Sequence, residues 1–164
     1  MPRERTFSWD DPSPISEAIA QLSGIDCLRR LIAGELPPPP MARLMDIRLV
    51  EVAAGRAVFE STPSEFHYNP QGIVHGGFGG TLLDSAMGCA VHTVLDAGDV
   101  YTTLEFKINF LRPITAASGL LRGVGTVIHA GRTTAVAEGR IEGPDGKLYG
   151  MATCTCLIRR RAPG

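Results

Sequence analysis

The segment from residue 69 to residue 95, NPQGIVHGGFGGTLLDSAMGCAVHTVL, constrains the fold more than any other part of the chain. From Thr81 to Leu95 apolar side chains recur at helical spacing and cover most of the helix circumference. A helix that is apolar on nearly all sides must be surrounded by protein. The pattern therefore predicts a central core helix over Thr81–Leu95, entered through a glycine-rich segment.

Asp84 is the only acidic residue in this segment. A buried carboxylate is costly unless it is hydrogen-bonded or paired, so Asp84 needs either a structural partner or a chemical role. The residues alone leave these two roles equally open. Gly80 and Gly88 share a helix face with Asp84, and glycine costs a helix about 1 kcal/mol relative to alanine. We therefore expect another group to approach this face closely.

The composition indicates one globular domain. Of the 164 residues, 44% are hydrophobic, and the net charge is −1. The near-neutral charge argues against an extended surface for nucleic acid or membrane, and no apolar run is long enough to span a bilayer. The N-terminus lacks the apolar core of a signal peptide, so we expect a cytoplasmic protein. The four cysteines lie in apolar patterns and are interpreted as small buried hydrophobes.

The chain divides into a helical, proline-rich N-terminal extension at 1–40, a main domain at 41–158 and a solvated basic tail at 159–164. Within the extension, one helix is predicted over Pro14–Leu22, and Pro37–Pro40 should be extended.

The caps of the two extension helices can also be predicted. Ser13 should cap the first helix, Asp26 should cap the second, and Gly34 should end the second.

Six strands are predicted in the main domain, over Arg43–Val52, Gly55–Ser61, Tyr101–Leu111, Gly119–Ala130, Arg132–Glu142 and Lys147–Ile158. Strict alternation in the third strand assigns Thr102, Leu104, Phe106, Ile108 and Phe110 to one face and Thr103, Glu105, Lys107 and Asn109 to the other. The order of elements predicts an α+β fold in which an antiparallel sheet curls around the long helix. Its open edges would favour pairing with a second subunit.

Four features together resemble the hotdog-fold acyl-CoA thioesterases of the phenylacetate-degradation (PaaI) type, which are related to 4-hydroxybenzoyl-CoA thioesterase. These features are Asn69-Pro70, His75-Gly76-Gly77, Asp84 nine residues after the histidine, and Phe110-Leu111-Arg112-Pro113. The similarity extends over 37–158. The combined spacing is more specific than any one of these motifs.

The resemblance implies that the thioester carbonyl lies at the N-terminus of the central helix, where backbone N–H groups favour an oxyanion. It assigns this donor to the amide of Gly76 or Gly77 and the catalytic carboxylate to Asp84. It also implies that Asn69 orients the carbonyl or the attacking water and that His75 supports the loop. Whether Asp84 acts as a general base or as a nucleophile stays open.

The resemblance places a hydroxyl at Thr103 or the adjacent Thr102 to support the water, and we choose Thr103 because it lies on the polar face of its strand. It assigns the CoA moiety to two stretches, one containing Lys107, Asn109 and Arg112 and the other formed by Gly131-Arg132-Thr133. Arginine suits phosphate through its charge and planar fork. No cofactor is implied, because CoA is part of the substrate. The expected assembly is a homodimer, often doubled to a dimer of dimers, in which Asp84 faces Asn69 and Gly76 of the partner.

Three alternatives are less specific. A hydratase or dehydratase could use His75 and Asp84 as an acid–base pair, and a non-catalytic acyl-CoA-binding module would not need Asp84. Lys107, Arg112 and Arg132 could be ordinary solvated residues. His67, His92 and His129 have no ligand-like spacing with the cysteines, so no metal site is predicted.

Overall fold

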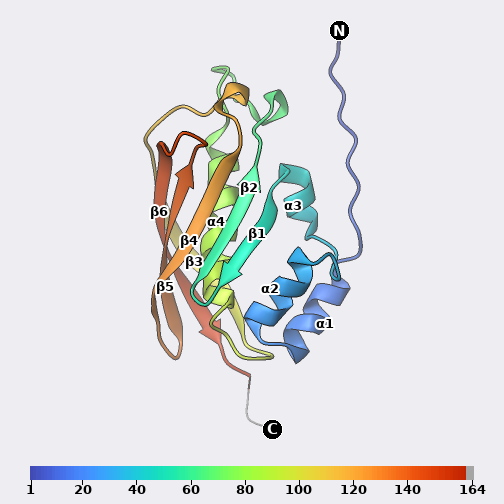
Figure 1. Ribbon diagram of the computed structural model, residues 1–164, viewed down its shortest axis with the longest axis vertical. Coiled ribbons are helices and arrows are strands. Elements are labelled where there is room, and N and C mark those ends of the chain that lie inside the picture. The colour runs from blue at the N-terminus through green and yellow to red at the C-terminus, as the bar shows by residue number, and fades with distance from the viewer. Residues whose placement is uncertain (162–164) are drawn as a thin grey trace.

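Six antiparallel strands form one sheet that curls around a single long helix (Figure 1). The computed structural model describes residues 1–161. The strand order is β1-β2-β4-β5-β6-β3. The strands are β1 Arg48–Ala53, β2 Arg56–Ser61, β3 Val100–Phe110, β4 Leu121–Ala130, β5 Thr134–Glu142 and β6 Leu148–Arg159, and the central helix is α4 Gly76–His92. The predicted hotdog arrangement is confirmed.

Helix α4 supplies the centre of the core. Leu82, Leu83, Met87 and Val91 have no exposed surface. The predicted core helix is therefore confirmed, but its limits were wrong at both ends. Helix α4 begins five residues earlier than Thr81, because the His75 side chain caps the first turn, and it ends at His92.

Glycines on β4 allow the sheet to approach α4 closely. A Cβ built on Gly125 would lie 2.2 Å from the carbonyl oxygen of Ala86, which belongs to the helix backbone. Side chains of β3 also fill the space above the helix glycines: Gly79 meets Phe110, and Gly88 meets Tyr101. The close approach expected from the glycines is thus an approach by the protein's own sheet.

The predicted alternation of β3 is interrupted. The pairing with β6 skips one residue between Thr103 and Glu105, so Leu104 forms a β-bulge. Thr103 bonds a residue of α4, and Phe106 packs against the same helix. The prediction that put these two side chains on opposite faces was wrong, because a bulge reverses the alternation beyond it.

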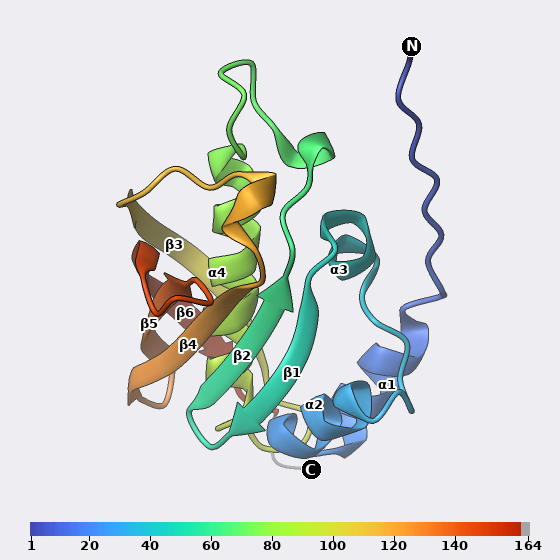
Figure 2. The ribbon, with the colours of Figure 1, turned by 45° about the horizontal axis from the view of Figure 1, so that its top comes forward.

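Three helices precede the sheet, α1 Ser13–Gln21, α2 Gly24–Ile32 and α3 Pro40–Met45. In Figures 1 and 2, α1 and α2 lie together beside β1, near the C-terminal end of α4. Helix α3 occupies the first part of the segment Arg43–Val52, so the prediction of a strand there was wrong. Pro40 starts this helix and Asp46 ends it in the left-handed conformation, with φ of 49°.

The predicted N-caps of the extension were also wrong, the first by one residue and the second by three. Pro12 is the N-cap of α1, and Ser13 lies inside the helix with its hydroxyl on Asp11. Ser23 caps α2 by accepting a hydrogen bond from the backbone N–H of Asp26. Gly34 follows α2 with φ of 76°, which confirms it as the stop.

The beginning of the C-terminal segment is bound to the domain instead of being free in solvent. Arg160 donates to Asp99 at 2.7 Å and to the carbonyl oxygens of Gly131 and Arg132. Residues 162–164 of the predicted basic tail lie outside the described residues. Within residues 1–161, no helix combines the length and apolar character that crossing a bilayer requires.

A pair of substitutions tests the packing between β4 and α4. Gly125→Ala should lower the free energy of unfolding by about 3 kcal/mol or more, because its methyl group would meet backbone atoms that cannot rotate away. Gly80→Ala should leave it unchanged or raise it by up to about 1 kcal/mol, since its methyl group meets Ile108 at 3.6 Å. Urea unfolding measures both changes. Equal losses in the two variants would contradict the proposed contact.

Candidate functional site

Asp84 lies on α4 opposite β3, where the hydroxyl of Thr103 donates a hydrogen bond to its Oδ1 at 2.9 Å. The side chain is half-buried and lines a cavity of about 640 Å³. The predicted choice of Thr103 over Thr102 agrees with this contact. The reason for that choice, a polar strand face turned away from the core, was wrong, because Thr103 faces the helix. The structure thus provides both roles considered for Asp84, a structural partner and access to a cavity.

The first turn of α4 carries one occupied and one free amide. The Nδ1 atom of His75 accepts a hydrogen bond from the N–H of Gly77 at 2.8 Å. Among the described residues, no hydrogen bond from the N–H of Gly76 is formed, as is usual at a helix start. Of the two predicted oxyanion donors, only Gly76 is therefore available for a ligand.

Asn69 is held by its own backbone turn. Its Oδ1 accepts from the N–H of Gln71 at 2.9 Å and from that of Ile73 at 3.4 Å. The side-chain oxygen is thereby occupied, and the amide nitrogen is left to donate. Asn69 thus combines the turn role that is common for Asn-Pro with a donor aimed outside the turn.

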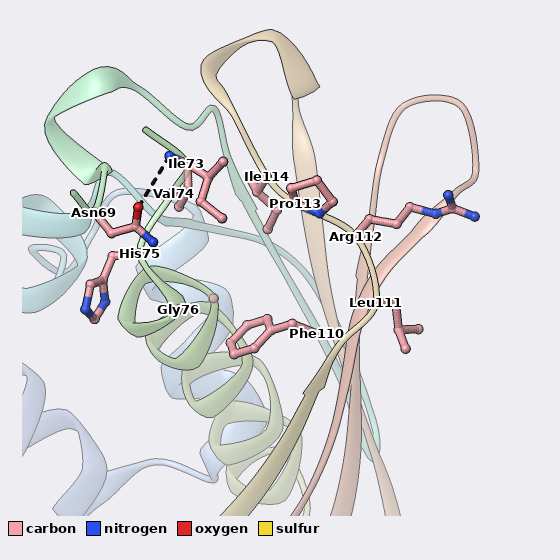
Figure 3. A pocket seen from close by; sticks show the side chains of 11 residues that line it. Asn69, Ile73, Val74, His75, Gly76, Phe110, Leu111, Arg112, Pro113 and Ile114 are labelled. Carbon is pink, nitrogen blue, oxygen red and sulfur yellow. Dashed lines mark hydrogen bonds between the residues drawn. The ribbon is translucent and has the colours of Figure 1, made fainter. Parts of the chain in front are cut away.

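Asn69 and Gly76 line a second cavity of about 460 Å³ (Figure 3). Phe110 closes one side, and its ring would lie 3.1 Å from a Cβ on Gly76. Arg112 also lines the cavity, but its guanidinium group points away from Asn69 and Gly76 (Figure 3). This cavity therefore offers two hydrogen-bond donors, which suit a carbonyl oxygen.

The predicted catalytic residues occupy two separate places in one chain. Gly76 and Asp84 are eight residues apart on the same helix, which corresponds to about 12 Å at a rise of about 1.5 Å per residue. A thioester carbonyl bound at the amide of Gly76 is therefore out of reach of Asp84 in the same chain.

The predicted CoA-binding residues are also divided. Strand β6 pairs with both β5 and β3, and this pairing puts Thr134, at the start of β5, level with Thr102 of β3. Arg112 lies just beyond Phe110, at the other end of β3. Thr102 and Phe110 are eight residues apart, or about 26 Å along a strand. The turn Gly131-Arg132-Thr133 and Arg112 therefore lie at opposite ends of the sheet. Lys107 and Asn109 are exposed between them.

The larger cavity was not predicted from the sequence. It lies between the N-terminal extension and α4, and its lining includes Leu31 of α2 as well as Cys89 and His92 of α4. The apolar stripe of α2 and the smaller or polar residues at helical spacing on α4 are the signals that could have indicated it. These signals do not predict the cavity by themselves, because its shape depends on how α2 and α4 pack against each other.

Burial favours the neutral form of several ionisable groups that line this cavity. It raises the pKa of the Cys89 thiol to about 12, with a further contribution from the charge of Asp84. It raises the pKa of Tyr101 well above its usual value and lowers the pKa of His92. Within the described residues, no cluster of three or more potential ligands is suited to a metal ion.

Comparisons with known proteins find similar sequences. A family model for the thioesterase superfamily matches residues 71–149. A protein named "Putative esterase" from Saccharolobus solfataricus is 34% identical over 118 residues, which cover 72% of this chain and 82% of the relative. A 1,4-dihydroxy-2-naphthoyl-CoA hydrolase from Listeria monocytogenes is 27% identical over 70% of this chain and 92% of its own.

A solved structure shows the same fold. The crystal structure of a "putative thioesterase, phenylacetic acid degradation-related protein" from Ralstonia eutropha superimposes with a TM-score of 0.72. It is 33% identical and covers 79% of this chain and 98% of its own.

Burial of His92 should make stability depend on pH. Because the folded-state pKa of His92 lies below the value of about 6.5 in the unfolded chain, unfolding takes up a proton below that pH. His92 therefore favours the folded state fully above about pH 6.5 and progressively less as the pH falls. Urea unfolding between about pH 7.5 and pH 5 should show this loss, at no more than about 1.4 kcal/mol per pH unit for one proton. The slope should be shallower in His92→Leu, and identical slopes would contradict the assignment.

Proposed function

Because the chain belongs to the thioesterase superfamily, we propose that it hydrolyses the thioester bond of an acyl-CoA to a carboxylic acid and free CoA. The observation that carries the proposal is the carboxylate of Asp84, held by the hydroxyl of Thr103 at a cavity large enough for a small acyl group. The substrate named for the Listeria relative supports an acyl-CoA as the substrate class.

The proposed chemistry follows from the groups in place. In one route the carboxylate of Asp84 removes a proton from water, the water oxygen attacks the thioester carbonyl, the C–S bond breaks, and the CoA sulfur takes the proton from Asp84. In the other route the carboxylate attacks the carbonyl itself, and CoA leaves as a thiolate while a mixed anhydride forms. Water then hydrolyses the anhydride, which releases the acid, restores Asp84 and supplies the proton for the thiolate. The free N–H of Gly76 stabilises the negative charge on the carbonyl oxygen, helped by the helix dipole. Water is the only co-substrate, and no bound cofactor enters the reaction.

A complete site requires two chains under this proposal. Within one chain, about 12 Å of helix separates Gly76 from Asp84. Strand β3 is at the edge of the sheet and carries the exposed apolar side chains of Leu104, Phe106 and Phe110. Pairing of two β3 edges would cover these side chains and bring Asn69 and Gly76 of one chain toward Asp84 of the other. A dimer is the smallest such assembly, and a dimer of dimers would contain it twice.

The engagement of His75 favours hydrolysis over the hydratase alternative. Its Nδ1 accepts from the N–H of Gly77, so this nitrogen is committed to the helix cap. We assign His75 to positioning the amides of the first turn.

The first test removes the proposed base. Asp84→Asn should lower kcat by about two to four orders of magnitude, because it keeps the side-chain shape and loses the basic oxygen. Thiol release from a panel of aromatic, short-chain and medium-chain acyl-CoAs measures the effect. Asp96→Asn, which changes an exposed carboxylate just beyond α4, is the control and should retain normal turnover. Normal turnover in Asp84→Asn would refute the assignment.

The second test separates the two chains of the composite site. Asp84→Asn and Asn69→Ala subunits, each inactive alone, should regain activity when they are unfolded together and reassembled. Mixed dimers contain one intact site and one site with both changes, so up to about half of the activity per dimer should return. Native mass spectrometry checks that mixed dimers form. Mixed dimers without activity would show that the site is not shared.

A further inference from the structure

The N-terminal extension forms one wall of the cavity that reaches Asp84. Ile15 and Ile19 of α1, Leu31 of α2 and Met41 of α3 line it from one side, and α4 lines it from the other. The family model that matches residues 71–149 includes none of these four residues. The extension therefore adds a wall whose shape belongs to this chain and not to the matched family segment.

The cavity runs along α4. Ser85, Cys89 and His92 all line it, and their spacing of four and three residues places them on one face of the helix. Asp84 lies at one end of this stretch, and His92 is eight residues away, about 12 Å along the axis. A group that enters beside Asp84 can therefore extend along α4 beneath the extension.

The extension is fixed to the body of the protein at the far end of this cavity. The N–H of Gly24 donates to the carbonyl oxygen of Leu95 at 3.0 Å, and the N–H of Gly98 donates to that of Ile19 at 2.8 Å. Gly24 is packed so tightly that a Cβ would lie 1.8 Å from the carbonyl oxygen of His92. These contacts hold α1 and α2 in place, so the wall is part of the folded structure.

The lining of the cavity has few ionisable side chains that could bind an anion. Asp84 is its one carboxyl group, and no lysine or arginine is among the residues that line it. Burial raises the pKa of Cys27, Cys89 and Tyr101 and lowers the pKa of His92, so it favours the neutral form of each. A carboxylate at the end of a bound chain would lose its hydration there and would find no lysine or arginine to pair with.

We propose that this cavity is the acyl chamber and that the N-terminal extension makes the protein selective for uncharged acyl groups, aromatic or of medium chain length. The chamber volume of about 640 Å³ lies within the range of small-ligand pockets. Acyl groups that end in a second carboxylate are excluded. This inference rests on the proposed thioesterase function for the position of the thioester, and it goes further by assigning the acyl class to the extension.

Binding of CoA thioethers, which cannot be hydrolysed, tests the chamber separately from catalysis. Isothermal titration calorimetry of the full chain should show S-hexyl-CoA binding at least about tenfold more tightly than S-methyl-CoA, because the longer chain buries additional methylene groups. A thioether with the same chain length and a terminal carboxylate should bind no more tightly than S-methyl-CoA. Equal affinities for all three compounds would overturn the proposal.

Substitutions on α2 locate the effect in the extension. Leu31→Trp should fill the chamber and weaken S-hexyl-CoA binding at least about tenfold, with S-methyl-CoA binding unchanged. Ile32→Trp is the matched control, because Ile32 is the next residue on the helix, is 40% exposed and does not line the chamber. It should leave both affinities unchanged. Equal weakening of both compounds by Leu31→Trp, or no weakening, would contradict the role of the extension.

Two further measurements keep the outcome clear. If Leu31→Trp does not fold, as judged by circular dichroism, Leu31→Ala should instead enlarge the chamber and shift the preference toward S-decyl-CoA. Selective thioether binding without thiol release from any acyl-CoA would refute the thioesterase proposal and leave the chamber intact. Thiol release from acyl-CoAs without chain-length selectivity in binding would refute the chamber proposal and leave the thioesterase proposal intact.

Discussion

The packing of α4 inside the curled sheet is the constraint on which the rest of the structure depends. The helix is apolar on nearly all sides, and the sheet can surround it only where backbones approach closely. Gly125 allows this on β4, and Gly79 and Gly88 make room for aromatic side chains of β3. The helix is thereby held at a fixed depth and rotation, which positions Asp84 opposite Thr103.

A rigid central helix also separates the chemical groups. The free amide of Gly76 is at its N-terminus, and the carboxylate of Asp84 is two turns further along. Because a helix cannot shorten, these groups meet at one carbonyl only if a second chain supplies one of them. The proposed shared site therefore follows from the length of one helix, and the apolar edge of β3 is the surface at which we propose that the second chain pairs.

The extension gives the main domain a cavity that the curled sheet alone would not enclose. Helices α1 and α2 dock through hydrogen bonds to the segment between α4 and β3, and they face the half-buried stretch of α4 that the sheet leaves uncovered. The same helix thus presents an apolar face to the sheet and a stripe with Ser85, Cys89 and His92 to the extension. On this stripe Ser85 and Cys89 are half-buried, whereas His92 is buried beneath the extension.

Local periodicity was sufficient to determine the long elements of this protein. The apolar run of α4, the strands of the second half and the lone carboxylate at Asp84 could be predicted, because spacing along the chain decides which side chains share a face. The motif around His75 also indicated the family. The start of α4 at Gly76, the helix at Pro40–Met45 and the bulge at Leu104 could not be predicted in this way. A cap, a short helix and a bulge each depend on a few hydrogen bonds, which a periodic pattern does not record. Only the tertiary structure decided that Thr103 of β3 donates to Asp84 of α4 and that the extension encloses a cavity beside it. These properties arise from contacts between elements, whereas the sequence pattern describes each element alone.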